Sequence, residues 1–398
     1  MKRCTVIVTD GEQRAALAVV RTLGEHGYRC IVTSSSRRSI AAGSRFVART
    51  VPVPNALERP GEFAEAIIAL VAAERAAIVL PIAEQSLLAI LPVRARLAPA
   101  IVPFPDLASF SALTDKELLL EEASKLGIAI PAQEIVRDIE ALASLDLSRL
   151  QYPIVLKPAR SVGERAGVRT TFSVTYASDA SELNRKLRAL PPAAFPLLLQ
   201  QRVVGPGIGI FLLLWDGELK AQFAHQRLTE KPPSGGVSVY RESVAIDEEL
   251  RDRSRALLDR FGWRGVAMVE YKRDIVTGQP YLMEVNGRFW GSLQLAIDSG
   301  IDFPRILVAC ALGEGTEEVS PYRVGVRSRW WWGQVDNLVA RVRRPSNAEP
   351  LPSNTRSARR SVGDLLLGPL RRDDYEEVLR WTDPGPFWNE TIRWIARR

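Results

Sequence analysis

Two glutamates lie inside apolar segments that the sequence predicts to be neighbouring β-strands. Glu270 interrupts residues 266–271, Glu284 interrupts residues 281–285, and Thr277-Gly278 between them favours a hairpin turn. Two carboxylates on adjacent apolar strands would lose hydration and repel each other unless their charge is compensated. A hard divalent cation does this, since Mg²⁺ prefers carboxylate and carboxamide oxygens as ligands. The pair therefore predicts a magnesium site.

Asn286 and Arg288 extend the same pattern. Both share the parity of Glu284, so on an extended strand their side chains point to the same face. Glu270, Glu284 and Asn286 are accordingly the candidate ligands of Mg²⁺, with Mn²⁺ as an alternative ion, in a site that would also meet the phosphates of ATP. Arg288 would hold the charge that develops on a phosphoryl or carboxylate group. The alternative is that Arg288 and Lys272 only neutralise the two glutamates.

A lysine at a strand end is a third candidate for chemistry. Lys157 closes the apolar segment 152–156 and is followed by a loop that contains Ser161 and Gly163. Only eight of the 53 basic residues are lysine, so a lysine in an apolar setting needs a reason in a chain that otherwise uses arginine. Its ammonium would supply charge to triphosphate oxygens, and the loop amides would supply donors. The alternative is a strand lysine whose charged end reaches water.

His225 and Arg227 precede a loop of small residues at 232–236. Such a loop could fold over an active centre, where Arg227 would hold an acyl phosphate or a substrate carboxylate. His225 would assist a proton transfer, because imidazole titrates near neutral pH. The alternative is a strand histidine satisfied by hydrogen bonds. Glu84, shortly after a strand that ends at Pro81, is a candidate for a substrate pocket.

The elements that must position these residues fall into three regions. Strand and helix alternate over residues 3–105, which predicts a small parallel sheet with helices on both faces, an α/β domain at 1–110. No G-x-G-x-x-G motif follows the first strand, so a dinucleotide site is not supported. Residues 111–312 show an α+β pattern, in which Thr114 is the expected cap of a helix. Residues 313–398 form an Arg- and Trp-rich extension, with a flexible loop expected at 344–360.

Composition excludes several classes of protein. The 398 residues are 46% hydrophobic and 25% charged, as in ordinary globular proteins. Three cysteines and two histidines argue against a disulfide framework and a multi-histidine metal centre. No apolar run reaches the ~20 residues that a membrane helix needs. We see no secretory signal at the N-terminus, and we expect a cytoplasmic protein.

Positive charge is concentrated in the extension. The net charge is +7, and most of it belongs to residues 321–398, so the basic character of the chain does not indicate a nucleic-acid partner. Trp330-Trp331-Trp332 and residues 386–398 combine tryptophan with arginine, which suits a membrane surface. Only a short amphipathic segment is present, so we expect these aromatics to pack on the body of the protein instead.

Taken in order, these motifs resemble the ATP-grasp superfamily, most of all its carboxylate–amine ligases and carbamoyl-phosphate-synthase-like members. The matching elements are Asp115-Lys116, Lys157 with its loop, Gln200-Gln201-Arg202-Val203, Glu270 and Glu284-x-Asn286-x-Arg288, and they span roughly residues 5–312. The resemblance implies an α/β plus α+β architecture, the ATP-grasp fold. It would comprise a Rossmann-like pre-ATP-grasp domain at 1–110, an ATP-grasp domain at 111–312 with a small lid at about 150–203, and the C-terminal extension at 313–398.

The same resemblance assigns a nucleotide site. By position, Lys116 and Lys157 would contact phosphates of ATP, and Gln200, Gln201 and Val203 would line the adenine hinge. We add Ser161, Gly163 and Lys272 to this ATP-binding set. The sequence departs from the family pattern at the hinge, where Gln-Gln replaces a glutamate, and residues 204–209 offer no carboxylate for the ribose.

The implied activity is the ATP- and Mg²⁺-dependent joining of a small-molecule carboxylate to an amine. The carboxylate would attack the γ-phosphorus to give an acyl phosphate and ADP, and the amine would displace phosphate and form an amide. Lys157, Arg288 and Arg227 would stabilise charge during phosphoryl transfer. The alternatives are carbamoyl-phosphate-like or other phosphoryl activation, and a non-catalytic ATP-binding protein. Since ATP-grasp enzymes are often dimers, a homodimer is the assembly to test.

Overall fold

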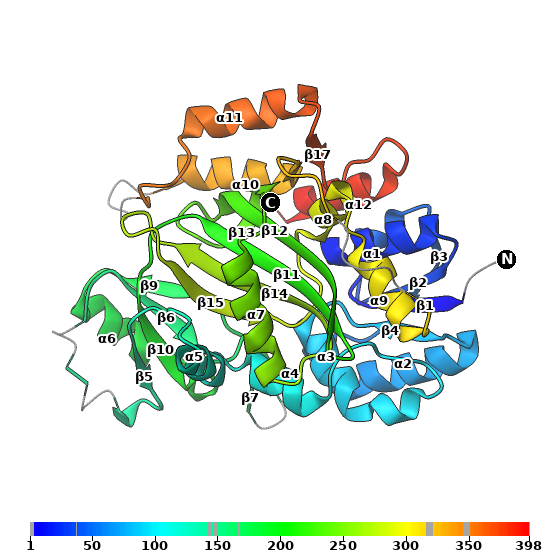
Figure 1. The fold of residues 1–398 in the computed structure, drawn as a ribbon, viewed down its shortest axis with the longest axis horizontal. Helices are drawn as coiled ribbons and strands as arrows, with labels where there is room; N and C mark the ends of the chain where they lie inside the picture. Colours follow the sequence, from blue (N-terminus) through cyan, green and yellow to red (C-terminus); the bar gives the residue numbers. More distant parts are fainter. Residues whose placement is uncertain are drawn as a thin grey trace.

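The N-terminal region of this computed structural model is a four-stranded parallel sheet with the order β3-β2-β1-β4. The structure describes residues 4–36, 38–141, 145–146, 150–165, 168–315, 321–344 and 351–397. The elements here are β1 (Thr5–Val8), α1 (Arg14–Glu25), β2 (Arg29–Ser34), β3 (Val47–Pro52), α2 (Pro60–Glu74), β4 (Ile78–Leu80) and α3 (Glu84–Ile90). The chain crosses the sheet in one direction from β1 to β2 and in the other direction from β3 to β4. Because both crossovers are right-handed, α1 and α2 lie on opposite faces of the sheet (Figure 1). The expected parallel α/β domain is confirmed.

A second, smaller sheet is antiparallel, with the order β5-β10-β6-β9, and we call it the lid sheet. Its strands are β5 (Gln133–Val136), β6 (Ile154–Pro158), β9 (Thr175–Ala177) and β10 (Leu197–Gln201); α6 (Ala180–Arg188) packs against β9, and β7 (Val162–Arg165) pairs with β8 (Val168–Thr171) as a hairpin. Leu156, Leu183 and Leu199 belong to a hydrophobic cluster that is separate from the main core. The lid sheet therefore has its own small core.

Helices α4 (Leu107–Thr114) and α5 (Lys116–Lys125) lead into the lid sheet, and the cap of α5 differs from the prediction. Asp115 caps the helix, and its carboxylate accepts hydrogen bonds from the backbone N–H groups of Glu117 (3.1 Å) and Leu118 (3.4 Å). Thr114 is instead the last residue of α4, where its hydroxyl donates to the Phe110 carbonyl at 2.9 Å. The prediction was wrong by one residue because two helices meet here without a loop.

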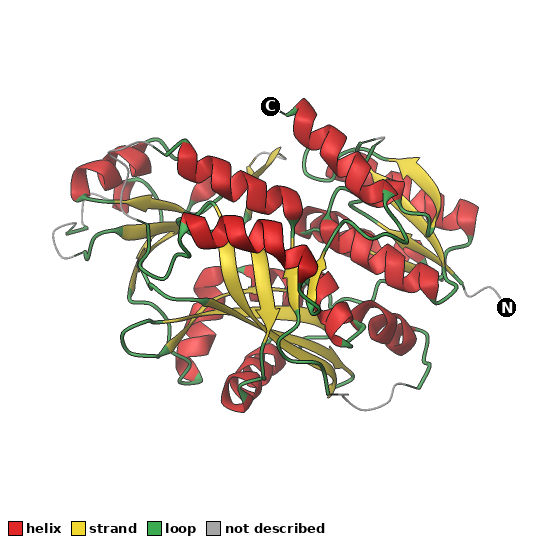
Figure 2. Cartoon of the chain, turned by 90° about the horizontal axis from the view of Figure 1, so that it is seen from above, coloured by secondary structure: helices red, strands yellow, loops and turns green. Residues whose placement is uncertain are grey.

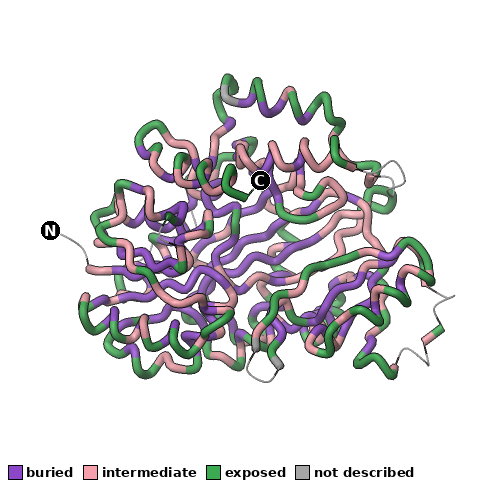
Figure 3. Tube along the Cα trace, turned by 180° about the vertical axis from the view of Figure 1, so that it is seen from behind, coloured by how far each residue is buried: buried purple, intermediate pink, exposed green. Residues whose placement is uncertain are grey.

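The largest sheet has seven strands in the order β15-β14-β11-β12-β13-β16-β17. The strands are β11 (Gly207–Trp215), β12 (Glu218–Lys231), β13 (Val237–Ser243), β14 (Gly265–Arg273), β15 (Pro280–Asn286), β16 (Arg327–Arg329) and β17 (Asp374–Glu376), and α7 (Glu248–Arg260), α8 (Leu293–Ser299) and α9 (Phe303–Ala311) complete this region. Only β16 and β17 pair in parallel. Phe211 packs on Trp290 with ring centroids 4.3 Å apart, which joins the sheet to the segment after β15. Figure 3 shows the buried strands at the centre of the molecule.

The C-terminal extension is folded onto both other regions. It supplies β16 and β17 to the large sheet, together with α10 (Trp331–Val342), α11 (Ala358–Leu367) and α12 (Gly385–Ala396). Part of the expected loop at 344–360 lies outside the described residues, and α11 begins inside it, at Ala358. Figures 1 and 2 show α12, in red in Figure 1, beside the N-terminal sheet. Trp332 stacks on Trp394 at 4.0 Å, so these two tryptophans pack within the protein, as expected. Trp388 on α12 differs from the expectation, because it is 60% exposed.

No helix in the described part of the chain combines the length and apolar character needed to cross a membrane.

Candidate active site

The two glutamates face each other across the hairpin formed by β14 and β15. Glu270 is the register partner of Glu284, and Met268 is the partner of Asn286, so the three predicted metal ligands share one face of the sheet. Val269 pairs with Val285 on the opposite face, and both are buried. The alternation of apolar and polar residues thus folds locally as the sequence indicates, with the polar side chains on one face of the hairpin.

Two lysines from other elements approach Glu284. Lys157, at the end of β6 in the lid sheet, has its Nζ 3.5 Å from Glu284 Oε2 and donates to the Met283 carbonyl at 2.7 Å. Lys116, the first residue of α5, has its Nζ 4.0 Å from the same carboxylate and donates to Ser161 Oγ at 3.0 Å. Both lysines are buried. The large sheet, the lid sheet and α5 therefore meet at Glu284.

These charges shift the pKa values of the two glutamates in different directions. Burial alone raises the pKa of Glu284, but the positive charges of Lys157, Lys116 and Arg227 outweigh it and hold this pKa at about 2. Burial also raises the pKa of Glu270, and there Arg227 opposes the shift only in part, so the pKa stays raised. Burial lowers the pKa of Lys157, against the attraction of Glu284. Glu284 is thus the permanent negative charge of the site.

Arg227, on β12, bridges two carboxylates. Its guanidinium donates to Glu270 and, at 3.0 Å, to Glu230, and a third bond of 3.3 Å reaches the Gly236 carbonyl in the loop after β12. Burial lowers its pKa, but Glu270 and Glu230 more than compensate, so the pKa is raised and the side chain stays charged. Gly207 on β11 leaves room for the Arg227 side chain, because a Cβ at this position would lie 2.8 Å from Arg227 Cδ. The predicted substrate-binding arginine therefore lies beside the candidate metal ligands.

Asn286 and Arg288 complete the polar face. The Asn286 amide lies 3.4 Å from Glu284 Oε1, and Arg288 donates to Asn286 Oδ1 at 3.1 Å and to the Phe289 carbonyl at 3.0 Å. Gly287 between them packs tightly, since a Cβ would lie 2.3 Å from the Trp263 ring. Arg288 is thereby held at the end of β15, next to the candidate metal ligands.

The N-terminal domain contributes Glu84 to the same cluster. Asp10, after β1, accepts hydrogen bonds from Ala83 N (2.9 Å) and Ser86 Oγ (2.7 Å), which fixes the start of α3 and hence Glu84. Burial raises the pKa of Glu84, while Arg288 and Lys116 act to lower it. The strand order reverses between β1 and β4, and the carboxyl ends of strands at such a point commonly form a ligand crevice. Glu84 therefore lies near the charges of Arg288 and Lys116, and its role in a substrate pocket stays a prediction.

The residues present fit a divalent cation. In the described residues no three His, Cys, Asp or Glu side chains converge as metal ligands. The candidate donors are therefore two carboxylates and the Asn286 carboxamide, which leaves positions for phosphate oxygens and water, as Mg²⁺ prefers. A cation here would relieve the repulsion between Glu270 and Glu284 that contributes to the raised pKa of Glu270. It would share these carboxylates with Arg227 and Lys157, which now neutralise them.

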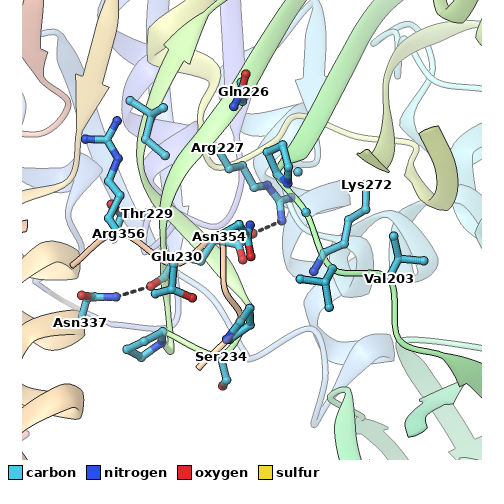
Figure 4. A pocket seen from close by; sticks show the side chains of 18 of the residues that line it. Val203, Gln226, Arg227, Thr229, Glu230, Ser234, Lys272, Asn337, Asn354 and Arg356 are labelled. Atoms are coloured by element: carbon cyan, nitrogen blue, oxygen red, sulfur yellow. Dashed lines mark hydrogen bonds and ion pairs between the residues drawn. The ribbon is translucent and has the colours of Figure 1, made fainter. Parts of the chain in front are cut away.

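An open pocket of about 290 Å³ lies beside this centre (Figure 4). Val203, Lys272 and Arg227 line it from the hinge and the large sheet. Asn337, Asn354 and Arg356 of the extension also line it. Asn337 donates to the Glu230 carbonyl, which ties α10 to β12. The pocket is strongly cationic, as a polyphosphate site requires.

Some predicted residues serve the lid rather than the charged cluster. The side-chain amides of Gln200 and Gln201 donate to Gln133 (2.6 Å) and Gln151 (2.7 Å), and the Gln201 backbone N–H donates to the Ala132 carbonyl (2.8 Å), so these donors are already used within the lid sheet. Gly163 sits in the β7–β8 hairpin, where a Cβ would lie 2.5 Å from the Ala193 carbonyl. Its role in the structure is close packing.

His225 is buried, and neither ring nitrogen has a hydrogen-bond partner within the described residues. Phe211 packs edge-on against it at 4.7 Å. Burial, with the charges of Arg227 and Arg241, lowers its pKa well below the usual value. The ring is thus neutral at physiological pH, which leaves it poorly suited to donate a proton.

Sequence reasoning missed Glu230 and the pocket residues of the extension. Glu230 reaches Arg227 only because β12 bulges between Arg227 and Glu230, which breaks the alternation that a sequence pattern relies on. Asn354 and Arg356 lie far along the chain from the hinge that they face. No local signal in the sequence indicates either contact.

Comparisons with known proteins agree with the fold. Residues 194–333 match the family described as "ATP-grasp in the biosynthetic pathway with Ter operon". An L-amino acid ligase from Bacillus licheniformis superposes with a TM-score of 0.61 at 19% identity, covering 80% of this chain and 76% of that one. N5-carboxyaminoimidazole synthetase from Staphylococcus aureus gives 0.61 at 10% identity, over 81% and 80%. Biotin carboxylase from Campylobacter jejuni gives 0.63 at 16%, over 82% and 75%. The suspected resemblance is confirmed at the level of the fold.

Proposed function

We propose that this chain, which has the ATP-grasp fold, is an ATP- and Mg²⁺-dependent ligase that joins a small-molecule carboxylate to an amine. The observation that carries the proposal is the convergence of Glu270, Glu284 and Lys157 from two sheets into one charged cluster. The structural relatives support it, since one is an L-amino acid ligase and others bind ADP or an ATP analogue.

Glu270, Glu284 and Asn286 would hold Mg²⁺, which when bound would neutralise phosphate oxygens and polarise the γ-phosphoryl group of ATP. Lys157 and Lys116 would contact the phosphates, because their ammonium groups already lie within 4.0 Å of Glu284. The pocket beside the hinge, with Val203 and Lys272, would take the remainder of the nucleotide.

Phosphoryl transfer comes first. An oxygen of the substrate carboxylate attacks the γ-phosphorus, the bond from that phosphorus to the oxygen of ADP breaks, and an acyl phosphate forms. Arg288 and Arg227 would hold the substrate carboxylate and the charge on the transferred group. Both side chains are oriented beforehand, by Asn286 and by Glu230 with Glu270, so little reorganisation is needed.

Amide formation follows. The amine nitrogen attacks the acyl carbon, the bond from that carbon to the phosphate oxygen breaks, and phosphate leaves. The proton released by the amine needs an acceptor, and we assign this role to Glu84. Its pKa is raised by burial, which makes it a better proton acceptor than an ordinary carboxylate.

A second candidate function is activation of bicarbonate in place of an organic acid. Biotin carboxylase and N5-carboxyaminoimidazole synthetase, both structural relatives, motivate it. Bicarbonate would meet the same arginines, Arg227 and Arg288, because it presents the same carboxylate geometry.

Nucleotide products distinguish these functions. The protein is incubated with ATP and Mg²⁺, together with pooled acids and pooled amines, each pool also being tested alone. We expect ADP and phosphate when acid and amine are both present. ADP release that requires bicarbonate but no organic acid would favour the second candidate, and AMP with pyrophosphate would contradict the acyl-phosphate mechanism. Once an acid is identified, ¹⁸O in its carboxylate should appear in the released phosphate.

A further inference from the structure

A second pocket of about 310 Å³ lies between the start of α1, the end of β12, α10 and α12. Three tryptophans line it, Trp330 and Trp332 at the start of α10 and Trp394 on α12. A volume of this size suits a small organic molecule rather than an ion. Nothing in the mechanism above uses it.

The tryptophans form a fixed apolar wall. Trp332 stacks on Trp394 with ring centroids 4.0 Å apart. Each indole N–H is already donated within the protein: Trp330 to Glu390 (2.8 Å), Trp332 to Thr391 (3.0 Å) and Trp394 to Asp336 (2.8 Å). Arg14 (4.0 Å) and Lys231 (5.1 Å) lie over the Trp330 ring, so Trp332 and Trp394 supply the apolar ring surface, and none of the three indoles has a free donor. Such a surface favours an aromatic or large aliphatic group as occupant.

Glu390 contributes a buried carboxyl group to the lining of the pocket. Only 6% of the residue is exposed; Oε1 accepts the bond from Trp330, and Oε2 has no partner among the described residues. Burial raises the pKa of this carboxyl to about 7, against the hydrogen bond from Trp330 and the charge of Arg14. A buried carboxyl oxygen without a partner is costly unless a donor occupies the pocket, and an ammonium group supplies that donor.

Cationic side chains lie on the same pocket. Arg14 pairs with Glu377 and Lys231 pairs with Asp336. Arg393 and Arg397 also line the pocket, and within the described residues neither makes an ion pair. They would favour a carboxylate on the molecule that binds.

Two routes connect this pocket with the proposed active site. Arg14 lies next to Gly291, three residues after Arg288, since a Cβ on Gly291 would be 3.1 Å from the Arg14 guanidinium. On the other side, Lys231 and Val237 line the pocket and flank the loop whose Gly236 carbonyl bonds to Arg227. The pocket is thus linked to the proposed phosphoryl-transfer centre through the segment after β15 and through the loop after β12.

We propose that this pocket binds an amino acid with an aromatic or large aliphatic side chain, as one of the two substrates of the ligase. The side chain would lie against Trp332 and Trp394, the ammonium would donate to Glu390 Oε2, and the carboxylate would face the arginines. This inference rests on the proposed function for its role in the reaction. The test measures the binding of amino acids, which can be detected without turnover.

The first experiment uses the unmodified chain. Binding of L-phenylalanine, L-tyrosine, L-tryptophan and L-leucine is measured by calorimetry, with and without ADP and Mg²⁺. We expect at least one to bind, and its analogues without the amine (3-phenylpropionate for phenylalanine) or without the carboxylate (phenethylamine) to bind at least about tenfold more weakly, as expected for loss of a charge-assisted bond. Failure of all four amino acids, or equal binding of 3-phenylpropionate, would overturn the proposal.

Glu390→Gln is the matching variant, because it keeps the shape and the bond from Trp330. We expect it to weaken amino-acid binding about tenfold and to leave 3-phenylpropionate unaffected, whereas Glu249→Gln, on the exposed face of α7, should behave as wild type. Unchanged amino-acid affinity in Glu390→Gln would count against the assignment. Amino-acid binding without ADP formation would contradict the proposed ligase activity but not the amino-acid pocket. ADP formation that needs no amino acid would contradict the proposed amino-acid substrate but not the ligase activity.

Discussion

Glu270 and Glu284 are register partners on adjacent strands, yet their surroundings differ. Lys157 and Lys116 hold the pKa of Glu284 at about 2, whereas burial keeps the pKa of Glu270 raised despite Arg227. Glu284 is therefore ionised at any physiological pH. Arg227 is the group that opposes the raised pKa of Glu270 most strongly, ahead of Lys157, which makes Arg227 the most informative residue to change.

Arg227→Gln should destabilise the protein in a pH-dependent way. Without the arginine, Glu270 is a buried carboxylate whose folded-state pKa rises further above its unfolded value, so the unfolded state loses its proton first as pH rises. Stability should therefore fall from about pH 4.5 upward. The loss at pH 8 should be about 3–5 kcal/mol, as for other broken buried pairs, and smaller at pH 5.

Urea unfolding at pH 5 and pH 8 measures this effect. The second substitution Glu270→Gln in the Arg227→Gln background should recover much of the loss at pH 8, since it removes the unpaired charge. Arg251→Gln, which breaks only surface pairs on α7, is the control and should change stability by less than about 1 kcal/mol. An equal loss at both pH values in Arg227→Gln would contradict the interpretation.

At the scale of elements, the close approach of β11 and β12 positions Arg227. Gly207→Ala places a Cβ 2.8 Å from Arg227 Cδ, so the arginine must shift from the position in which it pairs with Glu270. We expect turnover to fall at least about tenfold, because a misplaced charged group loses much of its stabilisation of the transition state. The measurement is steady-state ADP release.

Gly61→Ala is the matched control for that variant. Nothing lies within 4 Å of a Cβ at Gly61, in the first turn of α2, so turnover should stay unchanged and stability should be equal or higher by up to about 1 kcal/mol. Wild-type turnover in Gly207→Ala would show that Arg227 is not needed where the structure places it.

The elements that sequence reasoning predicted well are those with local signals. The β14–β15 hairpin follows from apolar runs on either side of Thr277-Gly278, and the parity of Glu284, Asn286 and Arg288 then fixes a shared face. The parallel N-terminal sheet follows from alternating strands and helices. Both patterns depend on residues close in sequence, so a single chain suffices to recognise them.

The extension could not be predicted in the same way. Its strands β16 and β17 have three residues each and exist because β13 offers an edge to pair with. The place of Asn354 in the pocket depends on tertiary packing. The pairing of Glu230 with Arg227 depends on a bulge in β12. Short strands and bulges carry almost no sequence signal.

At the scale of the whole molecule, the extension links the N-terminal domain to the large sheet. Asp383, before α12, accepts hydrogen bonds from Arg21 Nε (2.8 Å), Ser44 Oγ (2.8 Å) and Arg45 N (2.9 Å). Arg21 lies on α1 and is buried, so its charge depends on this partner. The close contact of Gly385 with Gly43 shows how tightly the two parts meet, since a Cβ on Gly385 would lie 2.1 Å from the Gly43 carbonyl oxygen.

Asp383→Ala should therefore cost about 3–5 kcal/mol, because it leaves the Arg21 charge buried and unpaired. Urea unfolding of the full chain measures the loss. The control, Asp373→Ala, removes an exposed carboxylate that pairs with Arg323 at 3.6 Å and should cost less than about 1 kcal/mol. Similar small losses in both variants would mean that the extension does not secure the N-terminal domain.

The central claim is that Glu284 organises metal, lysines and phosphates for phosphoryl transfer to a carboxylate. It is tested most directly by ADP release from wild type and Glu284→Gln, with ATP, Mg²⁺ and the acid and amine pools, after circular dichroism has shown that both are folded. The account predicts ADP and phosphate from wild type only when acid and amine are both present, and a loss of at least about 100-fold in Glu284→Gln. ADP release at the wild-type rate from Glu284→Gln would contradict it.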